Sequence, residues 1–276
     1  MSDVTAAGID MNAPYTPFSP MYVTRWGVNG PRVVMVHGSA QGSEVGGDLH
    51  FSRQKALADR GWQVIVPDRP GHGRSADPGR PDDAVADGQL VARLLGDGPG
   101  EGAHVVGHSF GGCVALSAAA QRPDRVRSLT IIEPAMAALA MDDPIVRRFV
   151  LNMVKVLFLS FSATRRIQKF VELVNIPDEI RGGSSPEELH RMGKAISKLK
   201  LPSAKALRDD LATVRQAGIP LMVVSGGWSP AFERVSDRVA ELGGGRRLVI
   251  PSPHHFPQQV SEEFNDTLEA FMSERR

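Results

Sequence analysis

The stretch that decides the fold is VVGHSFGG at residues 105–112, which an alanine-rich run at residues 113–121 follows. It has the form of an apolar strand that turns through G-x-S-x-G into a helix. So tight a turn forces Ser109 into an unfavourable backbone conformation, and the glycines two residues before and after it remove side chains that would collide. The turn lifts the serine hydroxyl out of the sheet and aims the first N–H groups of the helix at the same point. The pattern predicts a catalytic serine; a glycine-rich turn with a helix-capping serine is the alternative.

Apolar runs alternate with amphipathic runs on both sides of this turn. Continuous runs such as VVMVHG (33–38) and WQVIVP (62–67) are typical of strands buried on both faces, as in a parallel sheet covered by helices. The alternation therefore predicts an α/β fold with a doubly wound, mostly parallel sheet. We expect strands at 22–28, 32–37, 63–67, 104–108, 128–132, 221–225 and 247–250. We expect helices at 49–60, 82–95, 113–121, 231–242 and 262–275.

One long segment interrupts this alternation. From 135 to 216 no clear strand pattern occurs, whereas helical periodicity recurs at 143–160, 163–175, 186–197 and 203–216. We expect residues 135–216 to form a helical cap inserted into a core domain made of residues 21–134 and 217–276. Residues 1–20, which are rich in small and polar residues and proline, are expected to form a flexible leader.

The first expected cap helix is more apolar than a surface helix needs to be. Its hydrophobic face predicts a substrate pocket above the serine, and ordinary packing within the cap is the alternative. The expected pocket residues are Trp228, Phe149, Met153, Leu157 and Phe161.

Composition limits the remaining possibilities. The 276 residues include 42% hydrophobic ones, enough for a sizeable core, and the net charge of +1 gives no reason to expect a nucleic-acid partner. The single cysteine, Cys113, cannot form an internal disulfide. The N-terminus lacks an apolar signal segment, and the apolar stretch at 149–163 is too short to span a bilayer. We expect a cytoplasmic protein without a membrane partner; homo-oligomerisation stays open.

Catalysis by Ser109 needs two further groups. A serine hydroxyl is a poor nucleophile at neutral pH, so it requires a histidine to take its proton and a carboxylate to orient that histidine. In this arrangement the acid and then the histidine follow the serine along the chain. The segment PSPHHFP at 251–257 places His254 and His255 after the last expected strand. One of these two histidines is predicted to be the catalytic base.

The negative charge that develops on the substrate oxygen also needs hydrogen-bond donors, which form an oxyanion hole. One expected donor is the backbone N–H of Phe110, directly after the serine. The second should come from a loop after an earlier strand, and VHGS at 36–39 has that form. We expect the N–H of Ser39 to be this donor, with Gly38 beside it, and we expect His37 to brace the loop.

These motifs, together with DRPGHGRS at 68–75, resemble the α/β-hydrolase family over about residues 22–275, with a cap inserted after the sixth strand of the family. The resemblance implies a mostly parallel sheet, a serine nucleophile and acyl chemistry that uses no cofactor and no metal. It favours His255 over His254 as the base, because related sequences place theirs before Phe-Pro and the final helix. It also implies that residues 68–75 form a structural turn, so that His72 is structural.

The sequence departs from the family at the acid. Many members carry an aspartate after the seventh strand, but SGGWSP at 225–230 has Ser229 there, and a serine cannot stabilise an imidazolium by charge. Glu133 ends the strand that follows the helix expected at 113–121, and a buried charge there is costly unless it is paired. Haloalkane dehalogenases and zearalenone lactone hydrolases place a carboxylate at this strand end, so the resemblance favours Glu133 as the acid. One alternative is that Glu233 is the acid; otherwise Glu233 is an exposed first-turn residue favoured by the helix dipole. A second alternative is that Glu133 only braces the entrance of the cap.

The sequence thus predicts a cofactor-free serine hydrolase that cleaves a carboxylic ester or lactone of a hydrophobic small molecule through an acyl-enzyme. Ser109, His255 and Glu133 are the predicted catalytic residues. Carbon–carbon bond hydrolysis, hydroxynitrile lyase chemistry and perhydrolysis use the same residues and stay open. A ligand-binding protein without activity is a further alternative. The eight histidines show no metal-ligand spacing, so no metal site is predicted.

Overall fold

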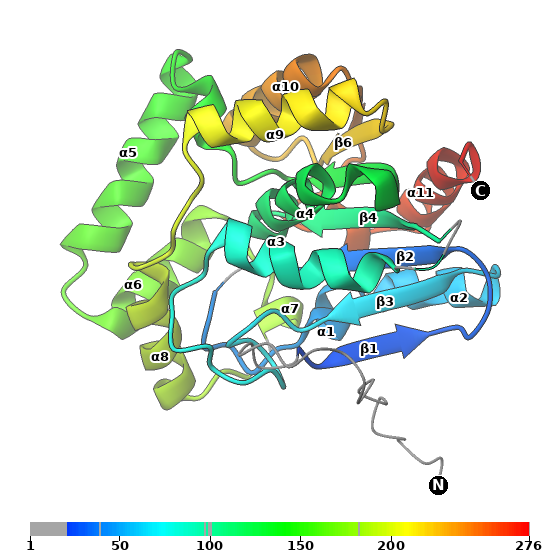
Figure 1. Cartoon of the computed structure of the whole chain (residues 1–276). Helices are drawn as coiled ribbons and strands as arrows, with labels where there is room; N and C mark the ends of the chain where they lie inside the picture. The colour runs from blue at the N-terminus through cyan, green and yellow to red at the C-terminus, as the bar shows by residue number, and fades with distance from the viewer. Residues whose placement is uncertain (1–20, 39, 97, 99–100, 182, 276) are drawn as a thin grey trace, which may run out of the picture.

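A computed structural model describes residues 21–38, 40–96, 98, 101–181 and 183–275 (Figure 1). The predicted leader at 1–20 and the predicted oxyanion residue Ser39 lie outside the described residues.

The core is a seven-stranded sheet in the order β1-β3-β2-β4-β5-β6-β7. Strand β1 runs antiparallel to β3, and all other neighbouring strands are parallel. All seven predicted strands are present, and the predicted doubly wound α/β class is confirmed. The strand before the cap, which the family counts as sixth, is the fifth strand here. The strands are β1 Val23–Trp26, β2 Arg32–Val36, β3 Gln63–Pro67, β4 Ala103–His108, β5 Val126–Ile132, β6 Leu221–Ser225 and β7 Arg246–Val249.

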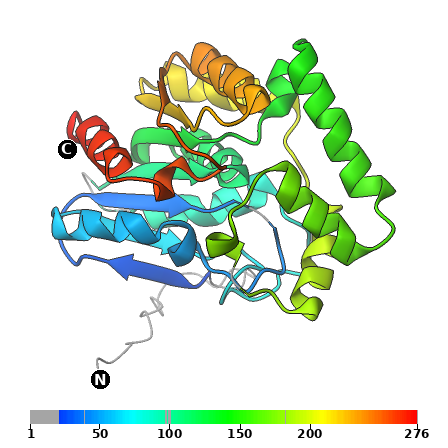
Figure 2. The ribbon, with the colours of Figure 1, turned by 180° about the vertical axis from the view of Figure 1, so that it is seen from behind.

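Helices cover both faces of this sheet (Figures 1 and 2). Side chains alternate along a strand, so Val34 and Val36 of β2 point into one core and Val33 and Met35 into the other. The first core packs against α3 (Ala84–Ala92), α4 (Phe110–Gln121), α9 (Ala204–Gln216) and α10 (Pro230–Gly243). The second packs against α2 (Ala56–Asp59) and α11 (Glu263–Ser273). Burial on both faces explains the continuous apolar runs in the sequence.

The single helix expected at 49–60 is wrong. The segment forms α1 (Gly47–His50), a 3₁₀ turn (Ser52–Lys55) and then α2. The break falls at Phe51, whose backbone leaves the helical region at φ −122° and ψ 26°, and whose ring is buried in the second core. Burial of this ring outweighs the helical periodicity.

Four helices of the segment expected to form the cap lie over the carboxyl ends of the parallel strands, and we call these four the cap: α5 (Pro144–Leu159), α6 (Ala163–Leu173), α7 (Asp178–Arg181) and α8 (Pro186–Ile196) (Figure 1). The cap boundary at 216 stays a prediction; α9, which that boundary counts with the cap, packs on α4 and α10 beside the sheet. The apolar stripe of α9, made of Leu207, Leu211 and Val214, is buried in the first core. Among the described residues, no helix is both long and apolar enough to cross a membrane.

Candidate active site

The turn between β4 and α4 holds Ser109 at φ 57° and ψ −121°, a conformation that costs a non-glycine residue about 1–3 kcal/mol. The two motif glycines are sterically required. A Cβ atom on Gly107 would lie 2.4 Å from the carbonyl oxygen of Gly111, and one on Gly111 would lie 2.2 Å from that of Val36. The strand therefore meets the helix at a distance that only glycine permits, which places the Ser109 side chain above the sheet.

Glu133 follows β5 directly and also has a positive φ, 48°. Its backbone N–H donates to the carbonyl oxygen of Val224 in the neighbouring strand at 2.8 Å, and its side chain is fully buried. One carboxylate oxygen accepts a 2.5 Å hydrogen bond from the N–H of Gly226, and the other lies 3.4 Å from Nδ1 of His255. The structure thus brings Glu133 to the histidine.

His255 is buried, and its backbone is fixed from two directions. Its N–H donates to the carbonyl oxygen of Asn175 at 3.2 Å, and its own carbonyl accepts from Nε2 of His108 at 2.8 Å. Its ring packs against Phe232 and Trp228, at centroid distances of 4.6 and 5.9 Å. Ser109 and His255 line the same small hollow, together with Gly38 and His108. The structure therefore brings Ser109 and His255 to the same place.

Sequence reasoning missed His108 and Asn175. Burial holds the pKa of His108 well below its usual value, so the ring is neutral and its Nε2–H serves as the donor to His255. Asn175, in the cap, has φ 50° and also donates from its side-chain amide to the carbonyl oxygen of Pro253 at 2.7 Å. A polar residue that ends a fully buried strand was the one available signal for His108. Nothing local marks Asn175, because it acts across the boundary between cap and core.

The competing candidates lie elsewhere. Glu233 pairs with Arg247 at 2.5 Å and accepts a hydrogen bond from the N–H of Gly227 at 3.0 Å. Ser229 is the N-cap residue of α10. His254 is only half-buried, and its Nδ1 accepts from the backbone N–H of Phe256 at 3.2 Å.

Of the predicted oxyanion residues, Phe110 and Gly38 flank the serine. Phe110 is the first residue of α4, where N–H groups have no partner within the helix. The backbone of Gly38 lies so close to the nucleophile that a Cβ atom on it would be 3.0 Å from Cβ of Ser109 and 3.5 Å from its Oγ. The loop after β2 therefore contacts the serine.

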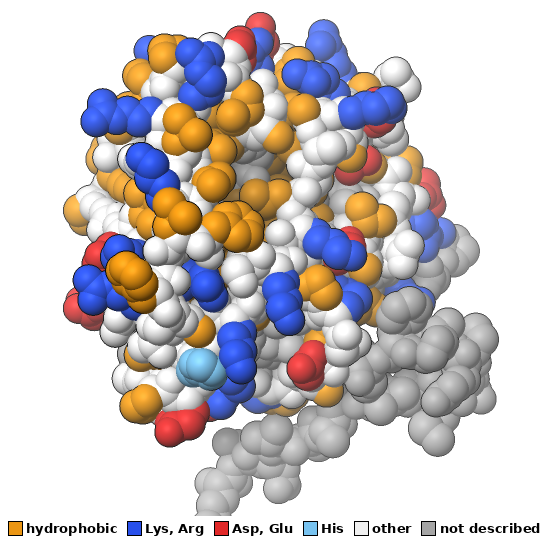
Figure 3. Space-filling view, turned by 90° about the vertical axis from the view of Figure 1, so that its left-hand side faces the viewer, with side chains coloured by type: hydrophobic (Ala, Val, Ile, Leu, Met, Phe, Trp, Pro, Cys, Tyr) orange, Lys and Arg blue, Asp and Glu red, His pale blue; other side chains and the backbone are white. Residues whose placement is uncertain are grey.

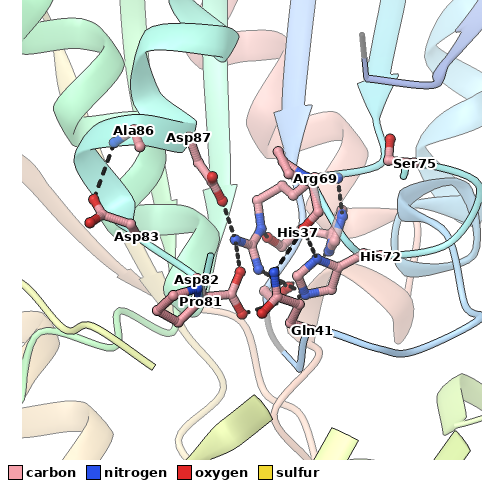
Figure 4. Close-up of polar contacts among 12 residues, drawn as sticks. His37, Gln41, Arg69, His72, Ser75, Pro81, Asp82, Asp83, Ala86 and Asp87 are labelled. Atoms are coloured by element: carbon pink, nitrogen blue, oxygen red, sulfur yellow. Dashed lines mark hydrogen bonds and ion pairs between the residues drawn. The ribbon is translucent and has the colours of Figure 1, made fainter. Parts of the chain in front are cut away.

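A buried arginine, Arg69, holds this loop (Figure 4). Its guanidinium donates to the carbonyl oxygens of His37 and Gly38, both at 3.0 Å. It also pairs with Asp82 at 2.7 Å and with Asp87 at 2.6 Å. Paired charges of this kind withstand burial, but removal of one partner leaves an uncompensated charge in the core.

The two histidines around Arg69, His37 and His72, form hydrogen bonds with backbone groups. Nε2 of His37 accepts from the backbone N–H of Arg69 at 2.9 Å, so its proton is on Nδ1, which donates to the carbonyl of Gly38 at 2.8 Å. Nδ1 of His72 bonds the carbonyl of Pro70 at 3.1 Å. Burial lowers the pKa of both rings, which keeps them neutral. In the described part of the chain, no cluster of His, Cys, Asp or Glu is arranged to hold a metal ion.

A cavity of about 300 Å³ opens from Ser109 between the core and the cap. Of the described residues in its lining, Ser109 and Ser197 are polar and the rest are apolar. Three of the predicted pocket residues line it, namely Phe149, Met153 and Leu157.

Two predicted pocket residues do not line this cavity. Trp228 stacks edge-on against the ring of His255 instead, and Phe161 lies beyond the end of α5 with 99% of its side chain exposed. Helical periodicity suggested Phe161, but α5 ends at Leu159, before that residue. Sequence reasoning missed lining residues from the core and from other cap segments, among them Pro134, Phe170, Leu199, Leu201 and Phe232.

Known proteins share this sequence pattern and this fold. Lipase LipV of Mycobacterium tuberculosis is 39% identical over 123 residues, 42% of each chain. The dihydrolipoyllysine-residue acetyltransferase component of the acetoin cleaving system of Pseudomonas putida is 30% identical over 263 residues, 90% of this chain. The matched segments span 42% and 66% of those relatives' own lengths.

Solved structures show the same fold at lower sequence identity. An N-acyl homoserine lactonase, AidH, in complex with N-butanoyl homoserine superposes with a TM-score of 0.66 at 21% identity, and 94% of each chain is covered. A lipase-esterase related protein from Clostridium acetobutylicum superposes with a TM-score of 0.67 at 17% identity, over 92% of this chain and 100% of that one. The sequence model of the alpha/beta hydrolase fold matches residues 31–174, more than half of the chain. With its Gly-x-Ser-x-Gly turn at Ser109 and its mostly parallel sheet, the chain belongs to the alpha/beta hydrolase fold family.

Proposed function

We propose that this protein is a serine hydrolase that cleaves a carboxylic ester or lactone with a hydrophobic acyl part. The observation that carries the proposal is the position of Ser109, between an apolar cavity of about 300 Å³ on one side and the buried pair of His255 and Glu133 on the other. A nucleophile, a base and a group that orients the base are the three parts that acyl transfer to serine requires.

In the first half of the reaction, Oγ of Ser109 bonds to the substrate carbonyl carbon while Nε2 of His255 takes its proton. Nε2 has this role because Nδ1 faces the carboxylate of Glu133. The carbonyl electrons move onto the oxygen, which accepts hydrogen bonds from the N–H groups of Phe110 and, in this proposal, Ser39. When the intermediate collapses, the carbon–oxygen bond breaks and His255 passes the proton to the leaving alkoxide.

In the second half, a water molecule attacks the acyl ester on Ser109, and His255 takes a proton from that water. Collapse of the second intermediate releases the carboxylic acid and returns a proton to Ser109. The carboxylate of Glu133 stabilises the imidazolium in both halves by its negative charge. In this proposal Glu133, directly after β5, takes the role of the aspartate that many family members carry after the seventh strand.

The lining of the cavity supports the hydrophobic acyl part. Alkyl and aromatic side chains such as Phe149, Leu157 and Phe232 surround it, and burial of apolar substrate there is favourable by about 25 cal/mol per Å². Among the described residues no charged side chain lines it, so a charged acyl part would lose its hydration without compensation.

The test measures hydrolysis of p-nitrophenyl butyrate and octanoate by the purified protein, with Ser109→Ala as the matched variant. We expect turnover that disappears in the variant, together with a stoichiometric acyl adduct on Ser109 in mass spectra taken during turnover. Equal activity in both proteins would overturn the assignment of Ser109. The hydrolase proposal fails if the intact protein hydrolyses no ester or lactone substrate and no fluorophosphonate labels it. A role in ligand binding would then take its place.

A further inference from the structure

The outer surface of the cap is unusually apolar at the end of α5 and in the turn that follows. Leu159 is 72% exposed and Phe161 is 99% exposed, and Leu151 lies exposed two turns earlier on α5. Exposed leucine and phenylalanine side chains gathered in this way are uncommon on a soluble surface and mark interaction sites. Figure 3, which views the α5 side of the molecule, shows hydrophobic side chains gathered around a hollow.

This apolar surface is continuous with the mouth of the substrate cavity. Val154, Phe158 and Leu201 line the cavity and are also exposed to solvent, Phe158 by 64%. Val154 and Phe158 stand on α5 next to the exposed leucines, so the same helix forms one wall of the cavity and part of the outer surface. A molecule that covered this surface would therefore meet the entrance of the site.

The charge of the surrounding segment has one sign. Residues 144–171 contain six Arg and Lys residues and no Asp or Glu. Two of the six, Arg147 and Arg166, donate to backbone carbonyl oxygens. The other four are exposed and form no ion pair within the described residues: Arg148, Lys155, Arg165 and Lys169.

We propose that the end of α5 and the 160–162 turn dock onto an anionic lipid–water interface, with the leucine and phenylalanine side chains inserted among the acyl chains. An apolar ridge flanked by cations is the pattern by which helices bind the surface of anionic bilayers. Docking there would turn the mouth of the cavity toward lipid, from which an apolar substrate could enter without crossing water. The sequence suggested no membrane partner; the proposal concerns peripheral binding, which needs no spanning helix.

Vesicle binding tests this proposal without depending on catalysis. The intact protein is sedimented with phosphatidylcholine vesicles that contain, or lack, phosphatidylglycerol. We expect binding to the anionic vesicles that weakens between 0.1 M and 1 M salt, where the Debye length falls from about 10 Å to about 3 Å. Leu159→Ser with Phe161→Ser should lower the partition coefficient about tenfold or more, since each side chain loses its burial in lipid. Lys155→Glu should lower it further.

Matched controls separate the possible failures. Val28→Ser removes another apolar side chain, 85% exposed, next to the sheet rather than on the cap, and should bind like the wild type. Ser109→Ala should also bind normally, so a failed hydrolase assignment would leave this result unaffected. Neither Leu159 nor Phe161 lines the cavity, so the double variant should hydrolyse dissolved p-nitrophenyl butyrate at the wild-type rate.

Two results would overturn the proposal. One is the absence of vesicle binding by the wild type, or binding that the double variant retains in full. The other is a wild-type dimer in light scattering that the double variant converts to a monomer without any vesicle binding, which would assign this surface to a second copy of the chain.

Discussion

Nδ1 of His255 lies 3.4 Å from a carboxylate oxygen of Glu133, and both side chains are buried. Glu133 precedes the expected cap insertion, directly after β5, whereas His255 follows the insertion, in the loop after β7. The second oxygen of Glu133 is held by the N–H of Gly226, so the carboxylate cannot turn away from the histidine without losing that bond. A buried carboxylate with one backbone donor and one histidine neighbour is suited to orient a base.

Glu133→Gln should therefore remove most of the turnover. The amide keeps the shape of the side chain but carries no charge to stabilise the imidazolium, and a fall of about 10⁴ in kcat is the reference for such a change. Steady-state kinetics with p-nitrophenyl butyrate measure it. Glu233→Gln is the matched control, because it loses the ion pair with Arg247 but not a contact with His255. A large loss in Glu233→Gln with little in Glu133→Gln would reverse the assignment.

Arg69→Lys should lower kcat with little change in KM. The guanidinium donates to two carbonyl oxygens of the loop after β2 and pairs with two aspartates, and it also lies over the ring of Phe110, 4.9 Å from the ring centroid. A lysine keeps the charge but cannot span these partners. We expect a fall in kcat of about tenfold to a hundredfold, less than the 10²–10³ for loss of an oxyanion donor.

The control for Arg69→Lys is a measurement that the variant is still folded. Circular dichroism and thermal unfolding of Arg69→Lys show whether the fold is retained, since the buried aspartates keep a positive partner. Full activity in a folded Arg69→Lys protein would show that the loop does not depend on the guanidinium.

Met153→Trp should shift the preference toward short acyl chains. Met153 lines the cavity from α5, and a larger ring there occupies space that a long chain would need. The ratio of kcat/KM for p-nitrophenyl octanoate to that for butyrate should fall about tenfold or more, as expected for the loss of a few methylene contacts. Leu151→Trp, on the exposed side of the same helix, should leave the ratio unchanged. An unchanged ratio in Met153→Trp would place the acyl chain elsewhere.

Asp210→Asn should raise the melting temperature more at pH 7.5 than at pH 4. Burial, together with the neighbouring charge of Asp209, raises the pKa of Asp210 to about 6. The folded protein thus binds this proton more tightly than the unfolded chain, so the free energy of unfolding falls as the pH rises from about 4 to 6. An asparagine cannot ionise and escapes this loss. Calorimetry of both proteins across this range would contradict the prediction if the difference were independent of pH.

Local sequence patterns predicted most of the sheet and one half of the site. All seven strands followed from apolar runs, because a strand buried on both faces carries its signal in its own residues. The strained turn at Ser109 followed from glycine spacing, and Gly107 and Gly111 prove to be positions where a Cβ atom cannot fit. Patterns failed where a neighbouring element decided the outcome. The helix expected at 49–60 breaks at Phe51, whose ring is buried in the second core.

By itself, then, the sequence determined the order of strands and helices, the strained turn at Ser109 and a short set of candidate partners for it. Only the tertiary structure decided that His255 and Glu133 lie together, that Glu233 is bound to Arg247, and that Phe161 points into solvent. The same holds for Arg69, Asn175 and His108, whose partners are remote in the chain. The physical reason is that periodicity and spacing fix where a side chain projects from its own element. Which group it meets depends on how elements far apart in sequence pack, and that packing is a property of the whole core.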